Sequence, residues 1–261
     1  MPATTVNVLD RAVSLLQAFS VSQPRMSLAE LSRATGLHRS TALRLLGTLV
    51  QAGLVQRDPG TGHYALGYET IALAETARAG TGLMDLARPV MQDISAQLDE
   101  TAVLSVRSGD HRVDLDQVVA AQPIRRVVSL GQHKLLTFGA PSLALICHDT
   151  PDALAGLLTR QQDATLARHP DFSAEALALD LAQLRSDGFY EQRRQYGPGS
   201  YSGSVGIAGP VRDRHGSVAC AFGVTAPASR VTPDLRDRMI AAVLDGCRAI
   251  SARLGGTQHD D

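Results

Sequence analysis

The chain has 261 residues, 44% of them hydrophobic, and a formal net charge of −1. This length and hydrophobic content suffice for two domains with separate cores, and the near-zero net charge excludes an overall basic field for nucleic acid. The three cysteines are scattered without metal-ligand or redox spacing, which is typical of reduced thiols in a cytoplasmic protein. No stretch resembles a signal peptide or a membrane span, so we expect no membrane partner.

Charge is distributed unevenly along the chain. Residues 1–70 contain six arginines and four acidic residues, whereas the remaining 191 residues contain 19 basic and 22 acidic groups. A mildly basic N-terminal end on a mildly acidic body favours nucleic-acid binding confined to that end.

The N-terminal pattern predicts a winged helix-turn-helix. An amphipathic helix is expected over Val8–Phe19, and Ser27-Leu28-Ala29-Glu30 is a capping box that starts a second helix. Gly36 ends that helix, and another runs from His38 or Arg39 to Gly53. The apolar stripe of this last helix consists of Ala42, Leu45, Leu46 and Leu49. The segment Leu54–Leu66, with a Gly-rich tip, predicts a hairpin that forms the wing.

The polar face opposite this stripe indicates a recognition helix. Arginine can bind guanine through two hydrogen bonds, and hydroxyl groups can bind phosphates or base edges. A helical subdomain that merely exposes arginines, or one that binds protein, is the structural alternative. We predict DNA contacts from Ser27, His38, Arg39, Ser40, Thr41, Arg44, Arg57, Thr61 and His63.

The rest of the chain predicts a spacer helix and a second domain of the α+β class. The helix Ile71–Ala79, ended by Gly80-Thr81-Gly82, is expected to act as a spacer or a dimer contact. An antiparallel meander is expected from the strands Thr101–Arg107, Arg112–Val119 and Ile124–Leu130, and two later strands from Ser204–Val211 and Val218–Val224. Helices are predicted at Met84–Leu98, Gly139–His148, Pro151–Leu158, Ser173–Ser186 and from Thr232 to about Leu254.

Motifs along the chain resemble the IclR family of bacterial transcriptional regulators. They are Leu9-Asp10-Arg11-Ala12, Gly36-Leu37-His38-Arg39-Ser40-Thr41, Arg44-Leu45-Leu46, Gly53-Leu54-Val55, Tyr64-Ala65-Leu66-Gly67 and Ile207-Ala208-Gly209-Pro210-Val211. The resemblance implies a winged helix-turn-helix domain at 1–67, a linker helix at 68–82 and a GAF-like effector-binding domain with an antiparallel sheet at 83–255. Residues 256–261 are expected to be a disordered tail. Such regulators act as homodimers or dimers of dimers on double-stranded DNA operators, respond to a small-molecule effector and use no cofactor.

An effector pocket follows from the same resemblance. The predicted contacts are Arg126, Val128, Gly139, Ala140, Tyr196, Ser204, Gly206, Gly223 and Thr225. Arg125 and Arg126 are adjacent on an expected strand, so one of them can face the pocket and bind an anion. Most implied positions are small, which favours a bulkier ligand than a short keto acid. Two departures stand out, because Gly139–Ala144 lacks the family's Thr-x-x-Gly-Lys-Ala pattern and Gln195–Gly199 lacks its usual carboxylate.

Signatures of other chemistry are incomplete. The run Gly197–Gly206 has Tyr201 where a nucleophile elbow needs serine, and the only lysine, Lys134, lies outside any phosphate-loop motif. Asp114 and Asp116 with His111 could suggest a metal site, but we expect both carboxylates to face solvent. We therefore predict a ligand-responsive DNA-binding transcriptional regulator of a catabolic operon, a repressor in preference to an activator, that senses a small organic acid or aromatic metabolite. A small-molecule hydrolase that uses the same pocket, or a protein-interaction module, is the alternative.

Overall fold

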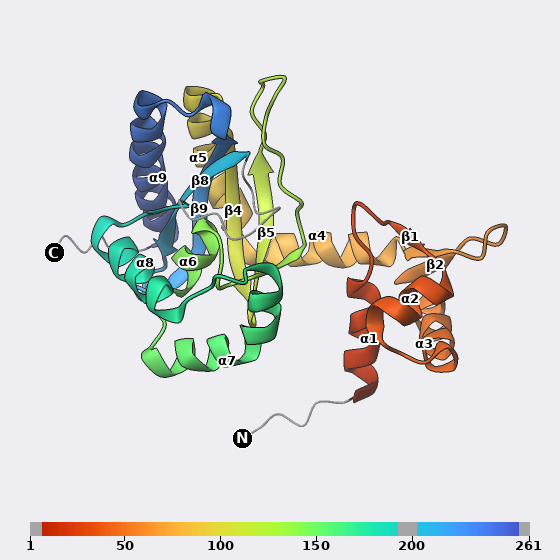
Figure 1. The fold of residues 1–261 in the computed structure, drawn as a ribbon. Helices are drawn as coiled ribbons and strands as arrows, with labels where there is room; N and C mark the ends of the chain where they lie inside the picture. Colours follow the sequence, from red (N-terminus) through yellow and green to blue (C-terminus); the bar gives the residue numbers. More distant parts are fainter. Residues whose placement is uncertain (1–6, 193–202, 256–261) are drawn as a thin grey trace. The chain divides into compact units, whose positions relative to one another are not determined.

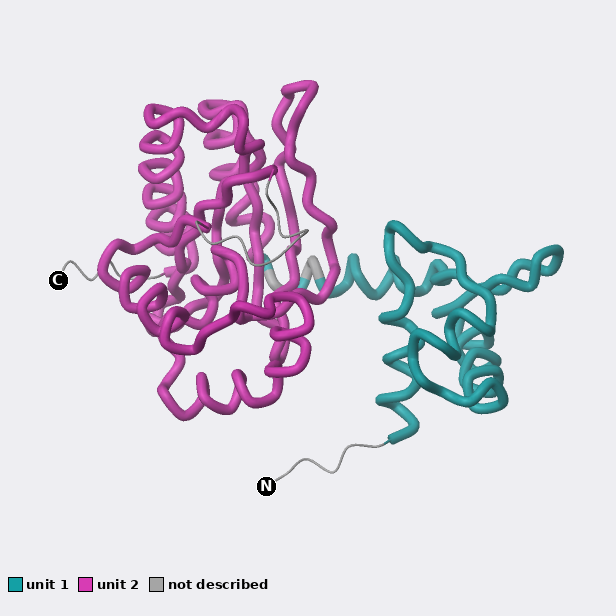
Figure 2. Tube along the Cα trace, viewed as in Figure 1, with its two compact units in different colours: residues 1–82 teal, residues 83–261 magenta. Residues whose placement is uncertain are grey.

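A computed structural model describes residues 7–192 and 203–255 of the chain (Figure 1). The chain divides into two compact units, Met1–Gly82 and Leu83–Asp261 (Figure 2). Each unit has its own hydrophobic core. The second unit has the α+β architecture that the sequence predicts, with helices packed on an antiparallel sheet.

The first unit is a helix-turn-helix with a small sheet. Its elements are α1 (Asn7–Gln17), β1 (Arg25–Met26), α2 (Leu28–Thr35), α3 (Arg39–Gln51), β2 (Val55–Arg57), β3 (Tyr64–Leu66) and α4 (Glu69–Thr81). The strands form an antiparallel sheet in the order β1-β3-β2. Gly36 follows α2 with φ 69°, the left-handed conformation that lets the chain turn toward α3. The side chains of Leu15, Leu31 and Leu46 are completely buried between the three helices.

The second unit is built on a six-stranded antiparallel sheet in the order β6-β5-β4-β9-β8-β7. Its strands are β4 (Thr101–Ser108), β5 (His111–Val118), β6 (His133–Leu135), β7 (Tyr190–Glu191), β8 (Ser204–Arg212) and β9 (Val218–Pro227). Its helices are α5 (Leu83–Leu98), α6 (Ala140–Ile146), α7 (Pro151–Arg168), α8 (Ala174–Asp187), the 3-10 turn η1 (Ala228–Arg230) and α9 (Pro233–Arg253).

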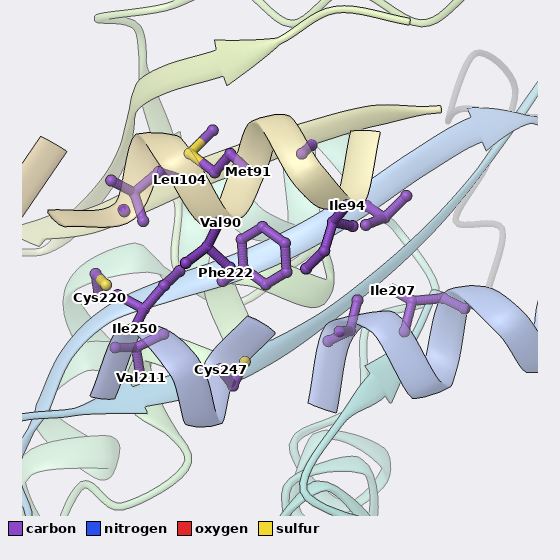
Figure 3. Packing of buried hydrophobic residues seen from close by; sticks show 14 of the residues in the cluster. Val90, Met91, Ile94, Leu104, Ile207, Val211, Cys220, Phe222, Cys247 and Ile250 are labelled. Atoms are coloured by element: carbon purple, nitrogen blue, oxygen red, sulfur yellow. The ribbon is translucent and has the colours of Figure 1, made fainter. Parts of the chain in front are cut away.

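One face of this sheet is closed by α5 and α9. Phe222 of β9 is fully buried at the centre of that core, between Val90 and Ile94 of α5 and the α9 helix (Figure 3). Gly246 lets α9 pack closely against Phe222 of the sheet, since a Cβ atom at position 246 would lie 2.4 Å from the Phe222 ring. The opposite face is covered by α6 and α8, whose apolar side chains pack against Ala208 and Ala221.

The predicted strand Ile124–Leu130 is wrong. Residues 119–132 are irregular, and β6 is the strand that pairs with β5. The Gly131 amide donates to the Asp114 carbonyl of β5 at 3.0 Å, but several other backbone groups in this segment bond to side chains. Thr101 Oγ1 donates to the Arg126 carbonyl at 2.6 Å. The side-chain amide of Gln117 donates to the Val128 carbonyl and accepts from the Val128 N–H, both at 2.9 Å.

Sequence patterns also missed β1 and β7 and ended α7 too early. Both strands have only two residues, too few for a period-two pattern. The helix α7 continues to Arg168, and the apolar pattern missed its second half because the buried residues there are polar, with Gln161 and Thr165 following Leu157 at intervals of four. Gln161 Oε1 accepts from the Leu136 amide, and the Thr165 hydroxyl bonds to that of Thr137 at 2.9 Å.

Candidate nucleic-acid interface and effector cavity

The helix α3 presents one polar face because its other face is fixed in the core. His38 is its N-cap, and its imidazole contacts the Ser40 hydroxyl at 2.9 Å and the Ser40 amide at 3.4 Å. Arg39, Ser40 and Arg44 are exposed, and Thr41 is half-buried. This places the predicted polar side chains on the first two turns of α3, where a recognition helix reads base edges.

Ser27 is the N-cap residue of α2. Its hydroxyl donates to Glu30 Oε2 at 2.7 Å and accepts from the Glu30 amide at 3.3 Å, while the Ser27 amide donates to the same carboxylate. These hydrogen bonds hold the pKa of Glu30 below its usual value. The predicted capping box is therefore confirmed, and any DNA contact of Ser27 has to coexist with it.

The tip of the wing is ordered by a carboxylate. Asp58 Oδ1 accepts from the amides of Gly60 and Thr61 at 2.8 and 3.0 Å, and the Asp58 backbone pairs with Gly62 and His63. The Thr61 and Gly60 amides lower the pKa of Asp58. Thr61 is exposed and His63 is half-buried, so both lie at the end of a defined hairpin.

Two arginines flank the wing. The guanidinium of Arg57 lies over the Tyr64 ring, 5.5 Å from its centroid, which restricts the side chain while its charge stays exposed. Arg25 of β1 lies 3.9 Å from Asp58, and its side chain is 73% exposed. Sequence patterns did not indicate Arg25, because β1 is too short to predict. It joins Arg57 as a basic group beside the wing.

The second unit contains a cavity of about 640 Å³ on the sheet face that α6 covers. Strands β4, β5, β6, β8 and β9 supply its floor, and the start of α6, the end of α7 and the segment 126–128 supply its walls. Eight of the nine predicted effector contacts line it, namely Arg126, Val128, Gly139, Ala140, Ser204, Gly206, Gly223 and Thr225. Tyr196 lies outside the described residues.

Small residues leave room for this cavity. Side chains alternate between the two sheet faces, and on β8 and β9 the large ones, such as Ile207 and Phe222, fall on the α5/α9 face. The cavity face receives Ser204, Gly206 and Gly223 instead. A Cβ atom on Gly206 would meet nothing within 4 Å, so the cavity is open at that position.

The irregular segment after β5 contributes an arginine to the lining of the cavity. Arg126 and Val128 line the cavity, whereas Arg125 and Val127 are exposed. Hydrogen bonds from the Thr101 and Gln117 side chains to the carbonyls of Arg126 and Val128 hold the backbone in this alternating arrangement. The expected division between Arg125 and Arg126 is therefore present, although the segment is not a strand.

The β5/β6 wall holds a charged cluster that sequence patterns missed. Asp114 is 1% exposed and lies 3.1 Å from Arg112 Nε and 2.5 Å from Lys134 Nζ, and it accepts from the Ser105 hydroxyl at 2.7 Å. Burial alone would raise the pKa of Asp114, but the Arg112 and Lys134 charges and the Lys134 and Ser105 hydrogen bonds outweigh it and lower the pKa.

The expectation that Asp114 and Asp116 face solvent is wrong. Both are buried, and they have different partners, since Asp116 accepts two hydrogen bonds from Arg88 of α5. A register shift between Leu104 and Ser105 on β4 accounts for this difference, because Leu104 lies opposite Asp116 and Ser105 opposite Asp114. The two carboxylates therefore do not converge on one metal ion.

An aromatic pair completes the cavity wall. The Phe138 and His169 rings stack with centroids 4.0 Å apart, and both residues line the cavity. His169 is 7% exposed. Apolar and cationic groups thus surround one space, which suits a ligand with an apolar body and an acidic group.

A winged-helix unit joined to a unit with a ligand-sized cavity defines a ligand-responsive DNA-binding regulator. Two family models match the chain, the IclR helix-turn-helix domain at residues 8–59 and the C-terminal domain of the bacterial transcriptional regulator IclR at residues 76–252. The chain belongs to the IclR family of bacterial transcriptional regulators.

Relatives support this assignment along the chain. The HTH-type transcriptional regulator Rv1719 of Mycobacterium tuberculosis is 32% identical over 73% of this chain and 72% of its own. The acetate operon repressor of Salmonella typhimurium is 26% identical over 97% of this chain and 92% of its own. An IclR homologue from Microbacterium hydrocarbonoxydans, solved with 4-hydroxybenzoate, has the same fold, with a TM-score of 0.74 at 20% identity over 95% of this chain and 98% of that chain.

These relatives are transcriptional regulators, which favours regulation over the hydrolase and interaction-module alternatives. Among the helices in the described ranges, none combines the length and apolar character needed to cross a bilayer.

Proposed function

We propose that the protein represses a catabolic operon and releases its operator when a small organic acid or aromatic acid enters the cavity. The observation that carries this proposal is the chemistry of the cavity, in which the described lining residues include Arg112, Arg126, Lys134 and Arg168 and a single carboxylate, Asp114. Arg112 and Lys134 are largely withdrawn from water, whereas Arg168 is exposed, and an excess of cations over carboxylates favours anionic ligands. The Salmonella relative is named as an operon repressor, and the Microbacterium homologue was solved with an aromatic acid.

On the DNA side, α3 enters the major groove and the wing contacts the flanking backbone. Arg39, Ser40 and Arg44 project from the exposed face of α3, and Arg57 and Thr61 lie on the wing. Ligand changes operator affinity only if it binds the operator-competent and the released arrangements with different affinity.

The functional form is a homodimer or a dimer of dimers. Two half-sites one helical turn apart require two recognition helices, which one chain does not supply. Exposed apolar side chains on α1 and α4 of the first unit support self-association: Val8, Leu9 and Val13 on α1, and Ile71 and Leu73 on α4, are 46–62% exposed. Sedimentation equilibrium should give at least twice the mass of one chain, and a monomer at micromolar concentration would contradict this assembly.

Fluorescence anisotropy tests the regulator itself. The protein should bind DNA that flanks its own gene about 1,000-fold or more tightly than scrambled DNA, with affinity falling steeply as salt rises. A genomic fragment library would locate a more distant operator. Equal, weak binding to every fragment, with and without acids, would contradict the proposal.

A further inference from the structure

The charged cluster on the β5/β6 wall has more positive than negative charge. Two cations, Arg112 and Lys134, share one carboxylate, Asp114, so the cluster carries a net charge of +1. The three side chains are 11%, 21% and 1% exposed. A positive charge held away from water is stabilised when an anion binds beside it.

Lys134 is the member of the cluster best placed to bind such an anion. An ammonium group has three N–H donors, and Asp114 Oδ2 accepts one of them. Lys134 also lines the cavity, so its other donors can reach an acceptor there. The Arg112 guanidinium already has a second partner within the protein, because its Nη1 donates to Ser142 Oγ. The Ser142 hydroxyl in turn donates to the Leu135 carbonyl.

A second cationic position lies elsewhere along the same wall. The Arg126 carbonyl is bonded to Thr101 and the Asp114 carboxylate to Ser105, and these two anchors are four residues apart on β4. At about 3.3 Å per residue, the anchors are separated by roughly 13 Å of strand. The Arg126 backbone and the Lys134–Asp114 cluster are therefore attached at separate points along β4, and Arg126 and Lys134 line the cavity together with the apolar Val103 and Phe138.

We propose that Lys134, held by Asp114, forms a second anion subsite, and that the ligand is a small dianion of the dicarboxylate class with one acid group at Lys134 and the other near Arg126. This inference rests on the proposed function only in taking the cavity as the effector site. A monocarboxylate satisfies one subsite, whereas a diacid with an apolar spacer satisfies both.

Calorimetric titration with matched acids tests the subsite. Adipate is compared with hexanoate and terephthalate with benzoate, so that each pair shares its spacer and differs by one carboxylate. The wild-type protein should bind the diacid of each pair about ten- to a hundredfold more tightly, the range of one hydrogen bond to a charged group. Lys134→Gln should bring this ratio close to one, and Lys134→Arg should retain most of it because the charge remains.

The control is Arg248→Gln on α9. Arg248 pairs with Asp245 on the surface and is 58% exposed, so this variant loses one positive charge from the same unit without touching the cavity. Its diacid ratio should equal that of the wild-type protein. A lower ratio in Arg248→Gln than in the wild type would show that net charge, and not Lys134, sets the preference.

Lys134 can also be observed directly, because it is the only lysine in the chain. Reductive methylation with ¹³C-formaldehyde labels Lys134 and the α-amino group and preserves their charge, but it leaves one N–H donor on Lys134, so the label reports an acid group beside the Lys134 charge and affinities are measured on the unlabelled protein. Terephthalate should shift the Lys134 methyl resonance by NMR and leave the α-amino resonance in place. Benzoate should shift the Lys134 resonance less at equal saturation.

Three results would overturn the subsite: equal affinity for mono- and diacids in the wild-type protein, an unchanged ratio in Lys134→Gln, or no binding of any of the four acids. Operator binding by the ligand-free protein is measured in parallel. Intact operator binding with any of these three results rejects the subsite alone, whereas absent operator binding rejects the regulator.

Discussion

The two candidate sites are assembled in different ways. The DNA-binding face comes from a short stretch, because α2, α3 and the wing occupy residues 28–66 and their key contacts join residues close in sequence. The cavity draws on five strands, the ends of two helices and an irregular segment, from Val103 to Thr225. The first site depends on local hydrogen bonds at the surface, and the second on buried charges brought together by the sheet. Substitutions in the two sites should therefore differ in both size and kind of effect.

The largest effect is expected for Asp114→Asn, which leaves Arg112 and Lys134 without their shared carboxylate. Removing one partner of a buried ion pair costs about 3–5 kcal/mol of unfolding free energy. The native pKa of Asp114 is lowered, so its contribution is present above the unfolded pKa of about 3.9 and is lost as the pH falls through the native pKa. Urea unfolding should therefore separate variant from wild type at pH 7, and the difference should shrink only as the pH falls below about 3.9 toward the lowered native pKa of Asp114.

The matched control for that change is Asp110→Asn. Asp110 pairs with Arg160 through two hydrogen bonds, but the two side chains are 31% and 57% exposed. Loss of such a pair should cost less than about 1 kcal/mol. Equal destabilisation by both variants would show that burial does not set the strength of the Asp114 cluster.

Arg44→Ala should have the next largest effect, on operator binding and not on stability. Arg44 is exposed on α3, so its removal costs no packing. If it reads a base, the variant loses about 1–3 kcal/mol of operator affinity and discriminates less at one base pair. Anisotropy on a set of singly substituted operators measures this, and equal weakening on all of them would assign Arg44 to a phosphate.

Ser27→Ala should destabilise the first unit by about 1 kcal/mol, because the α2 cap loses both its donor and its acceptor. Hydrogen exchange should become faster in α2 and stay unchanged in the sheet of the second unit. Ser22→Ala is the control, since Ser22 is exposed and bonds only to the Ser20 hydroxyl among the described residues. Faster exchange of the β4–β9 amides would contradict the independence of the two cores.

The smallest effect is expected for Arg57→Ala on the wing. The variant should weaken binding to operator and scrambled DNA alike and reduce the slope of log affinity against log salt by about one. The contact of the wild-type Arg57 guanidinium with the Tyr64 ring contributes little to the free energy of unfolding, so we expect the variant to lose little stability. An unchanged salt slope would remove Arg57 from the interface.

The contrast between the sites also explains what the sequence could predict. Ser27 and Glu30 are three residues apart, so the capping box is visible in the sequence and the structure confirms it. Lys134 binds a carboxylate 20 residues away, through a strand pairing and a register shift that no local pattern encodes. The predictions for the end of α7 and for the strand Ile124–Leu130 failed for a related reason. Polar groups were expected to face water, but in α7 they are buried, and at residues 126 and 128 side chains bond to the backbone. Cavity positions on β8 and β9 came from the family resemblance, and the charged wall came only from the structure.

We propose that a ligand in the cavity of the second unit changes operator affinity, and one variant tests this coupling directly. Gly206→Val places a side chain into open cavity space on β8, where a Cβ atom meets no neighbour within 4 Å. Operator affinity is measured by anisotropy with and without saturating adipate or terephthalate. The wild-type protein should lose about 5- to 150-fold in affinity, and Gly206→Val should bind the operator normally and not respond to acid. Identical wild-type affinities with and without an acid shown calorimetrically to bind, or a full response in Gly206→Val, would contradict the account.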